Sequence, residues 1–300
     1  MSHTVWVFPG QGSQAVGMGS DLVDHPHGKA RLQTASDILG WSVLEICQRE
    51  DDAVSDTRYT QPCLYVIESI LADILWADAA PNFVAGHSLG EYSALYAARA
   101  FDFESGLQLV KQRAEIMGQA SSGGMAAVIG ADREQLETLL AAENVVLAND
   151  NSAAQVVLSG AQDALDTVLS QLKAKRKVPL KVSGAFHSPL MAAASQRFEI
   201  LLDDTPFQDA TVPVLSNTEP VPETNAIALK ERLSRQMTGA VRWRETMLQF
   251  SDLGITTAVE VGPGKVLSGL MKRTCSGMTL QNVSSLDDIP TSQPTPQASQ

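Results

Sequence analysis

Cysteine is scarce in this sequence, and its three copies stand far apart, at positions 47, 63 and 275. None belongs to a C-x-x-C pair, so the pattern excludes a cysteine-based zinc site and a disulfide framework. Basic residues are also in deficit, 22 against 34 acidic ones, which gives a formal net charge of −12. This balance excludes broad nucleic-acid binding, because a polyanion would be repelled. The net charge does not exclude binding of a small anionic substrate, since a cleft can be locally positive.

Long uninterrupted apolar runs are missing as well. The most apolar long segment, residues 63–76, contains Glu68 and Asp73, which is typical of a buried amphipathic helix and not of a membrane span. The N-terminal segment MSHTVWVFPG has neither the basic region nor the long apolar core of a signal peptide. We therefore expect a cytoplasmic protein that binds neither membranes nor nucleic acid.

The chain has enough apolar residues, 44%, for a substantial core, and its 300 residues suit one large domain with an insertion, or two domains. Near residues 121–124 the pattern changes to strand, helix, strand, strand, helix, strand, the order of the ferredoxin-like unit. We predict an α/β body at 1–121 and 185–288, an inserted ferredoxin-like (βαββαβ) small subdomain at 122–184, and a disordered polar tail at 289–300. The expected strands are 4–8, 83–86, 125–129, 145–149, 155–159, 178–182, 212–216 and 257–261, and the expected helices are 30–39, 62–76, 89–98, 103–120, 133–142, 161–174, 229–236 and 265–272, with one more opening at 188–189.

A serine at a sharp bend is the first candidate for a reacting group. The segment Gly86-His87-Ser88-Leu89-Gly90 follows a short apolar strand, precedes a helical pattern and matches G-x-S-x-G. The two glycines leave room for the strained turn that exposes a nucleophilic serine beside free N–H groups. A helix cap is the alternative, because Ser88 and Glu91 also match the S-x-x-E capping box. The strand before the bend and the helix after it favour the nucleophile.

A nucleophilic serine needs a base, and His187 is the best placed of the five histidines. It stands just before Ser188-Pro189, which opens a helix. The positive end of that helix disfavours imidazolium, so the ring would stay neutral and able to accept a proton. A histidine that only caps the helix is the alternative. No aspartate can be assigned as a third member, and a backbone carbonyl could orient the ring instead, which would make the site a dyad.

Two further glycine-rich turns have weaker nucleotide-binding patterns. Residues 10–15 fit the loose dinucleotide fingerprint, but a helical pattern replaces the second strand that should follow with its acidic residue. Residues 262–265 lack the glycine spacing of a Walker loop. The basic run at residues 173–181 is typical of a solvated face, although it could guide an anionic partner.

Five motifs are spread over most of the chain, roughly residues 4–273. They are FPGQGSQ (8–14), GHSLGEYSAL (86–95), QRAEIM (112–117), GAFHSPLM (184–191) and EVGPGKVLSGL (260–270). Together, and in this order, they resemble one family, the malonyl-coenzyme A:acyl carrier protein transacylases of fatty-acid synthesis. The resemblance implies a hydrolase-like α/β body with a central, mainly parallel sheet, together with the ferredoxin-like insertion.

The resemblance implies that Ser88 carries the acyl group and that His187 is its base, in a dyad. Arg113 would clamp the malonyl carboxylate, since a guanidinium can donate two parallel hydrogen bonds to it; a surface salt bridge with Glu115 is the alternative. The remaining implied roles are backbone N–H donors of the oxyanion hole for Gln11 and Leu89, a main-chain carbonyl that steadies the histidine for Gln236, pocket walls for Met117 and Phe186, and contact with coenzyme A for Asn151.

The implied reaction moves the malonyl group from malonyl-CoA to the phosphopantetheine thiol of acyl carrier protein through a malonyl-serine intermediate. We expect a monomer with no metal or other cofactor beyond the coenzyme A thioester. A polyketide-type acyltransferase shares all the motifs and is the nearest alternative. A serine hydrolase or thioesterase, and a carrier-binding scaffold without activity, are the others.

Overall fold

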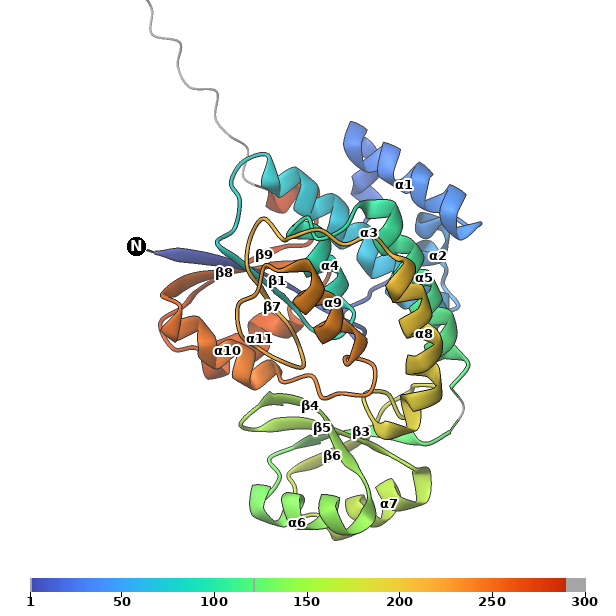
Figure 1. Ribbon diagram of the computed structural model, residues 1–300, viewed down its shortest axis with the longest axis vertical. Helices are drawn as coiled ribbons and strands as arrows, with labels where there is room; N and C mark the ends of the chain where they lie inside the picture. The colour runs from blue at the N-terminus through green and yellow to red at the C-terminus, as the bar shows by residue number, and fades with distance from the viewer. Residues whose placement is uncertain (1, 121, 290–300) are drawn as a thin grey trace, which may run out of the picture.

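Two β-sheets of different kinds organise the chain (Figure 1). The computed structural model describes residues 2–120 and 122–289, and within these ranges one sheet has five strands and the other has four. The larger sheet has the order β7-β2-β1-β8-β9, and each neighbouring pair is parallel, so the predicted central parallel sheet is confirmed. Its strands are β1 (His3–Phe8), β2 (Phe83–Gly86), β7 (Val214–Leu215), β8 (Ile255–Val261) and β9 (Thr279–Val283).

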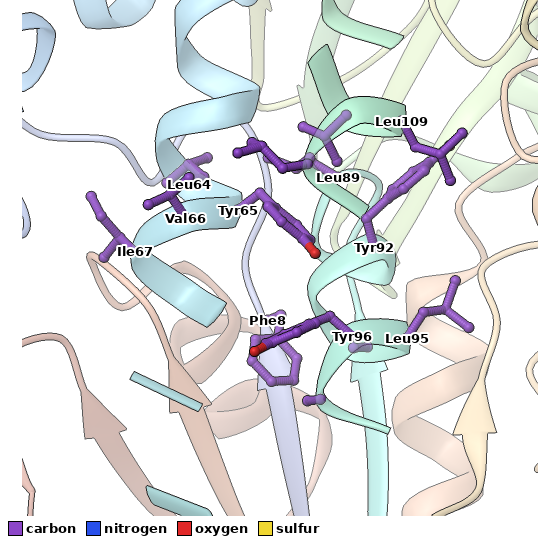
Figure 2. Close-up of a cluster of buried hydrophobic side chains, with 14 of the residues drawn as sticks. Phe8, Leu64, Tyr65, Val66, Ile67, Leu89, Tyr92, Leu95, Tyr96 and Leu109 are labelled. Carbon is purple, nitrogen blue, oxygen red and sulfur yellow. The ribbon is translucent and has the colours of Figure 1, made fainter. Parts of the chain in front are cut away.

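Helices cover both faces of the larger sheet, because the side chains of its strands alternate between two apolar cores. Trp6 and Phe8 of β1 belong to one core, and Val5 and Val7 belong to the other. Figure 2 shows the first core, where side chains of α3 face those of α4. The helices of this core are α1 (Pro26–Leu39), α2 (Val43–Gln48), α3 (Thr57–Trp76), α4 (Gly90–Ala97), α5 (Phe103–Gly118), α8 (Ala192–Asp204) and α9 (Ala226–Ser234), and those of the second core are α10 (Trp243–Asp252) and α11 (Val266–Thr274).

The smaller sheet is antiparallel and has the order β4-β5-β3-β6. Ala126 and Val128 pack on its two helices, whereas Met125 and Ala127 belong to the core of the body. Figure 1 shows the small sheet between these helices and the body. This is the ferredoxin-like arrangement predicted from the element order. Its elements are β3 (Gly124–Ile129), α6 (Arg133–Glu143), β4 (Val146–Ser152), β5 (Gln155–Gly160), α7 (Gln162–Gln171) and β6 (Arg176–Pro179). All of them lie within 122–184, although the exact subdomain limits stay a prediction.

Several elements differ from the sequence-based expectation. The helix expected at 229–236 ends at Ser234, so Gln236 lies outside it with a main-chain carbonyl free for other contacts. The helix expected to open at 188–189 begins as a 3-10 turn, Pro189–Met191, before α8. Strand β9 was not expected because it lies at the sheet edge and exposes alternate side chains, which weakens its apolar signal. Helices α2 and α10 were also not expected.

No helix in the described part of the chain is long and apolar enough to cross a membrane. The tail predicted to be disordered lies outside the described residues from Pro290 onward.

Candidate active site

Four turns meet at one edge of the larger sheet, where the carboxyl ends of β1, β2, β7 and β8 lie side by side. The register pairs Phe8 with Gly86 and Ala85 with Leu215, so these strands stop at nearly the same level. In open parallel sheets this edge is where ligands bind. The turn after β1 therefore lies beside the turn after β2, and the His87 N–H donates to the carbonyl of Phe8 across 2.9 Å.

The turn after β2 requires glycine at two positions. A Cβ atom on Gly86 would lie 1.9 Å from the carbonyl carbon and oxygen of Gly90, and one on Gly90 would lie 2.0 Å from the carbonyl oxygen of Phe8. Ser88 itself has φ 52°, in the left-handed region that non-glycine residues rarely occupy. Such strain persists only where the surroundings impose it, and it is common at reacting groups. This backbone lifts the serine out of the strand.

Ser88 and His187 are in direct contact, with 2.8 Å between Ser88 Oγ and His187 Nε2. His187 also has a left-handed φ of 55°. Its Nδ1–H donates to the main-chain carbonyls of Gln236, at 2.9 Å, and Gly239, at 3.2 Å. These bonds leave the lone pair of Nε2 facing the serine. Burial, together with the positive charge of Arg113, lowers the pKa of His187 from 6.5 to about 3, so the ring is neutral.

The capping alternatives for both residues are wrong. The N-cap position of α4 is Leu89, with no side-chain cap, because the Ser88 hydroxyl contacts His187. The Ser88 N–H donates to Asn217 Oδ1 across 2.7 Å, and not to Glu91 as a capping box would require. The turn after His187 is capped by Ser188, which accepts from the N–H of Leu190.

Arg113 of α5 is 1% exposed, and its guanidinium contacts the Ser88 hydroxyl. Its Nη2 donates to Ser88 Oγ at 3.1 Å and to Gln236 Oε1 at 3.0 Å, and its Nη1 donates to Gln61 Oε1 at 2.5 Å. Burial lowers the pKa of Arg113. Within the described residues Arg113 makes no ion pair, so the surface salt bridge considered above is wrong. A buried guanidinium hydrogen-bonded only to neutral groups is suited to an anionic ligand.

Two backbone donors lie beside the serine. Gln11, in the turn after β1, and Leu89, directly after Ser88, both line the same cavity as the serine hydroxyl. Neither N–H donates a hydrogen bond to another group in the described parts of the chain. Unpaired N–H groups at a helix start can stabilise a negative oxygen.

Ser88, Arg113 and His187 line one cavity of about 220 Å³, which residues of both sheets enclose. Met117 and Phe186, both buried, form part of its wall, and the Sδ atom of Met117 accepts from Gln61 Nε2 at 3.5 Å. Asn151 of β4 also faces the cavity, where its Oδ1 lies 2.8 Å from His87 Nε2. Gln236 does not line the cavity itself but contacts two residues that do, Arg113 and His187. All nine residues predicted for the site are therefore brought together: Gln11, Ser88, Leu89, Arg113, Met117, Asn151, Phe186, His187 and Gln236.

The sequence reasoning missed three residues that position these groups. Gln61 anchors Arg113 from α3, Asn217 binds the Ser88 N–H, and His87 links the nucleophile turn to β4. A usable signal existed for Asn217, since it follows a predicted buried strand at the carboxyl end of the sheet. Gln61 is a polar residue in a mostly apolar helix, which is a weaker signal.

Comparison with known proteins identifies close relatives. The family model described as acyl transferase domain matches residues 5–298. A Synechocystis sp. protein named malonyl CoA-acyl carrier protein transacylase is 58% identical, over 95% of this chain and 98% of the relative. A Bacillus subtilis protein named polyketide biosynthesis malonyl CoA-acyl carrier protein transacylase is 42% identical, over 89% of this chain and 96% of the relative.

Solved structures give the same result. The crystal structure of the Synechocystis malonyl-CoA:ACP transacylase superposes with a TM-score of 0.94 at 57% identity, covering 96% of this chain and 99% of that chain. A malonyl-transacylase solved in complex with a type II PKS acyl-carrier protein superposes with a TM-score of 0.89 at 33% identity, covering 96% of this chain and 98% of that chain.

Proposed function

The chain belongs to the acyl transferase domain family, and from this premise we propose that it transfers a malonyl group from malonyl-CoA to the phosphopantetheine thiol of acyl carrier protein. The observation that carries the proposal is the contact of three side chains in one cavity. Ser88 Oγ lies 2.8 Å from His187 Nε2 and 3.1 Å from Arg113 Nη2. An alcohol, a neutral imidazole and a cation at these distances suit covalent transfer of an acyl group that carries a carboxylate.

In the first step, Ser88 Oγ forms a bond with the thioester carbonyl carbon while His187 Nε2 takes the hydroxyl proton. The carbonyl oxygen becomes an oxyanion, which accepts hydrogen bonds from the N–H groups of Gln11 and Leu89. The carbon–sulfur bond then breaks, and the coenzyme A sulfur leaves with the proton from His187. The product is malonyl-Ser88, an ester.

In the second step, the carrier thiol gives its proton to His187 Nε2 and its sulfur attacks the ester carbonyl. The bond to Ser88 Oγ breaks, and the serine recovers the proton. The carbonyls of Gln236 and Gly239 keep the ring in one orientation through both steps, because each accepts from its Nδ1–H. The chemistry of both steps uses only side chains and N–H groups of this chain and the two thiols.

Arg113 selects the acyl group in this proposal. A malonyl carboxylate would accept two hydrogen bonds from the guanidinium, whereas an acetyl group offers no acceptor there. Charged hydrogen bonds contribute about 1.5–3 kcal/mol each, so the preference for malonyl is about ten- to a hundredfold or more. Met117 and Phe186 would narrow the remaining space against branched acyl groups.

A two-stage assay tests the function. Malonyl-CoA is mixed first with the chain alone, and intact mass should rise by one malonyl group. Addition of holo-acyl carrier protein should then discharge the adduct into malonyl-carrier product and restore the original mass. Discharge at the same rate without carrier, with release of free malonate, would identify a hydrolase and contradict the proposal.

A polyketide carrier is the second candidate acceptor, favoured by the 42% identity to the Bacillus subtilis polyketide relative. The acyl-serine step would be the same, and only the surface that meets the carrier would differ. Specificity constants for the malonyl-loaded chain with a fatty-acid carrier and with a polyketide carrier separate the two candidates. We expect the larger value with the fatty-acid carrier.

A further inference from the structure

Glu91 of α4 is a buried carboxylate that neither proposed step uses. It follows Ser88 by three residues and is 1% exposed, yet no cation contacts it directly within the described residues. Its Oε2 instead accepts from Gln236 Nε2, at 2.7 Å, and from the N–H of Asn217, at 3.2 Å. Burial of a carboxylate is costly, so these neutral donors indicate a purpose beyond stability.

Glu91 is one of the neighbours that determine which way the Gln236 amide points. A carboxylate only accepts hydrogen bonds and a guanidinium only donates them, while a glutamine amide has one end of each kind. Gln236 lies between the two: its Nε2 donates to Glu91 Oε2 at 2.7 Å and to the Ser88 carbonyl at 2.8 Å, and its Oε1 accepts from Arg113 Nη2 at 3.0 Å. Reversing the amide would place two donors against each other at Arg113 and two acceptors against each other at Glu91. Only the observed orientation satisfies both neighbours.

This orientation holds the guanidinium against the serine. The Arg113 Nη2 group that donates to Gln236 Oε1 also lies 3.1 Å from Ser88 Oγ, and Gln61 fixes the other terminal nitrogen. The carboxyl group of Glu91, whose pKa is raised by burial, thus lies one amide away from Arg113. A carboxylate in direct contact would occupy the guanidinium fork, whereas the intervening amide leaves the cation available to a substrate carboxylate.

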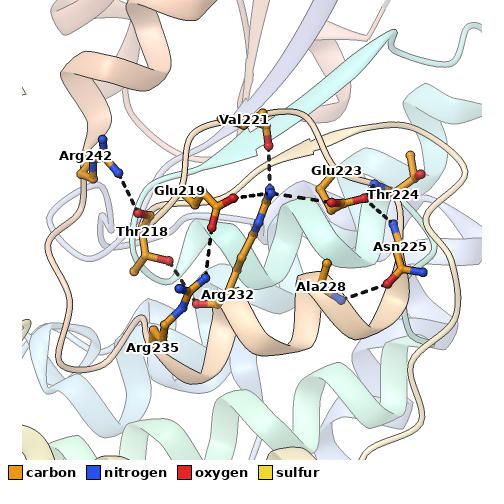
Figure 3. A network of polar contacts seen from close by, with 10 residues as sticks. All are labelled: Thr218, Glu219, Val221, Glu223, Thr224, Asn225, Ala228, Arg232, Arg235 and Arg242. Carbon is orange, nitrogen blue, oxygen red and sulfur yellow. Dashed lines mark hydrogen bonds and ion pairs between the residues drawn. The ribbon is translucent and has the colours of Figure 1, made fainter.

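The loop that follows Asn217 is held by hydrogen bonds from arginine side chains (Figure 3). Arg232 of α9 donates to the carbonyl of Val221 and to the carboxylate of Glu219, and Arg242 donates to the carbonyl of Thr218. The bonds of Arg232 attach the loop that carries Asn217 to the helix that precedes Gln236, and the bond of Arg242 attaches it to the start of α10. Both partners of Glu91 therefore have defined positions before any substrate binds.

We infer that Glu91 is a positioning residue for acyl-group selection: through the Gln236 amide, it orients Arg113 toward the carboxylate of the acyl group attached to Ser88. The inference rests on the proposed function, because it assumes that Arg113 binds that carboxylate. It assigns the S-x-x-E glutamate of the nucleophile motif to substrate specificity and not to helix capping.

The test compares malonyl-CoA with acetyl-CoA in Glu91→Ala, Glu91→Gln and the control Glu68→Gln. Glu68 is a second fully buried glutamate, on α3, and contacts none of these groups. We expect Glu91→Ala to lower the malonyl-to-acetyl ratio of kcat/KM by up to about tenfold, since Gln236 Nε2 loses one of its two acceptors and keeps only the Ser88 carbonyl. Glu91→Gln should keep most of the ratio, because its own carbonyl can accept from Gln236. Glu68→Gln should leave the ratio unchanged.

A second variant covers the case in which Glu91→Ala folds poorly. Gln236→Leu removes the amide but keeps the main-chain carbonyl that orients His187, so it should lower the same ratio by a similar factor. Loss of folded protein lowers both rates equally and cannot change a ratio. An unchanged ratio in Gln236→Leu or in folded Glu91→Ala, alongside a reduced ratio in Arg113→Ala, would overturn the inference and leave the proposed function intact. An unchanged ratio in Arg113→Ala would instead contradict the carboxylate clamp itself.

Discussion

The two sheets contribute different things to the one cavity. The parallel sheet supplies the proposed nucleophile and both proposed oxyanion donors from turns at its carboxyl edge. Helix α5 supplies Arg113, and the segment after α9 supplies Gln236. The antiparallel sheet supplies a wall, with Met125, Ala127 and Val157 facing the cavity beside Asn151. The comparison teaches that, under the proposed function, the reacting side chains depend on the parallel sheet and its helices, whereas contacts with the rest of the thioester depend on the antiparallel sheet.

The sheets also differ in how their site residues are held. Around Ser88, hydrogen bonds join the serine, His187, Arg113 and Gln236 into one buried network. The antiparallel sheet is attached to the body at fewer points. Strand β4 exchanges backbone hydrogen bonds with Val241, and Asp150 of β4 binds Arg244 of α10 across 2.8 Å. We therefore expect substitutions in the body to affect chemistry and substitutions in the small sheet to affect binding.

The largest expected effect is that of Ser88→Ala. Without the hydroxyl no acyl ester can form, so intact mass should show no malonyl adduct, and turnover should fall by on the order of 10⁴- to 10⁶-fold. The thermal midpoint should change little, because the substitution removes one hydroxyl and keeps the backbone of the turn. A malonyl adduct that persists in this variant would assign the nucleophile elsewhere.

Arg113→Ala tests whether the body also determines the preference for malonyl-CoA over acetyl-CoA. It should lower kcat/KM for malonyl-CoA about ten- to a hundredfold, while acetyl-CoA changes by only a few-fold, because the clamp serves the carboxylate. Arg113→Lys is the matched control, since it keeps the charge but lacks the fork and should recover only part of the preference. Equal losses for both thioesters would assign Arg113 to general support of the serine.

Asn151→Ala tests the small sheet. Loss of one hydrogen-bonding side chain from the wall should raise KM for malonyl-CoA by about two- to tenfold with kcat nearly unchanged. A truncated thioester, malonyl-N-acetylcysteamine, should react equally well with both proteins, because it lacks the nucleotide end of coenzyme A. A lower kcat with both thioesters would instead show that the contact of Asn151 with His87 supports the nucleophile turn.

The smallest expected effect is that of acid on acylation. Burial and the charge of Arg113 lower the pKa of His187 from 6.5 to about 3, so the ring stays a neutral, competent base throughout pH 5–8. The single-turnover rate of malonyl transfer to Ser88 should therefore be nearly flat over this range. An acid limb with a midpoint near 6.5 in the unsubstituted chain would contradict the lowered pKa.

Local sequence patterns were enough to predict most strands and helices, and also the two residues proposed to react. Alternation in β1 and the turn glycines after β2 identify two central strands, because burial and backbone strain act within a few residues of the chain. Ser88 and His187 were recognisable for the same reason, each lying at a turn next to a helix start. Strand β9 has a weak local signal, since only Leu280 and Val283 of its residues are apolar. Helix α10 was missed although Trp243, Met247 and Phe250 recur at helical spacing, so its local signal was present in the sequence.

Contacts between segments far apart in the chain could not be predicted from the sequence alone. Glu91 illustrates this: its motif predicts a helix cap, yet its partners lie more than a hundred residues away, at Asn217 and Gln236. By itself the sequence determined that strands, bends and helices follow one another in this order, with a serine and a histidine at two of the bends. Only the tertiary structure decided that they meet around a buried arginine, because hydrogen bonds between remote side chains form only after packing brings their segments together.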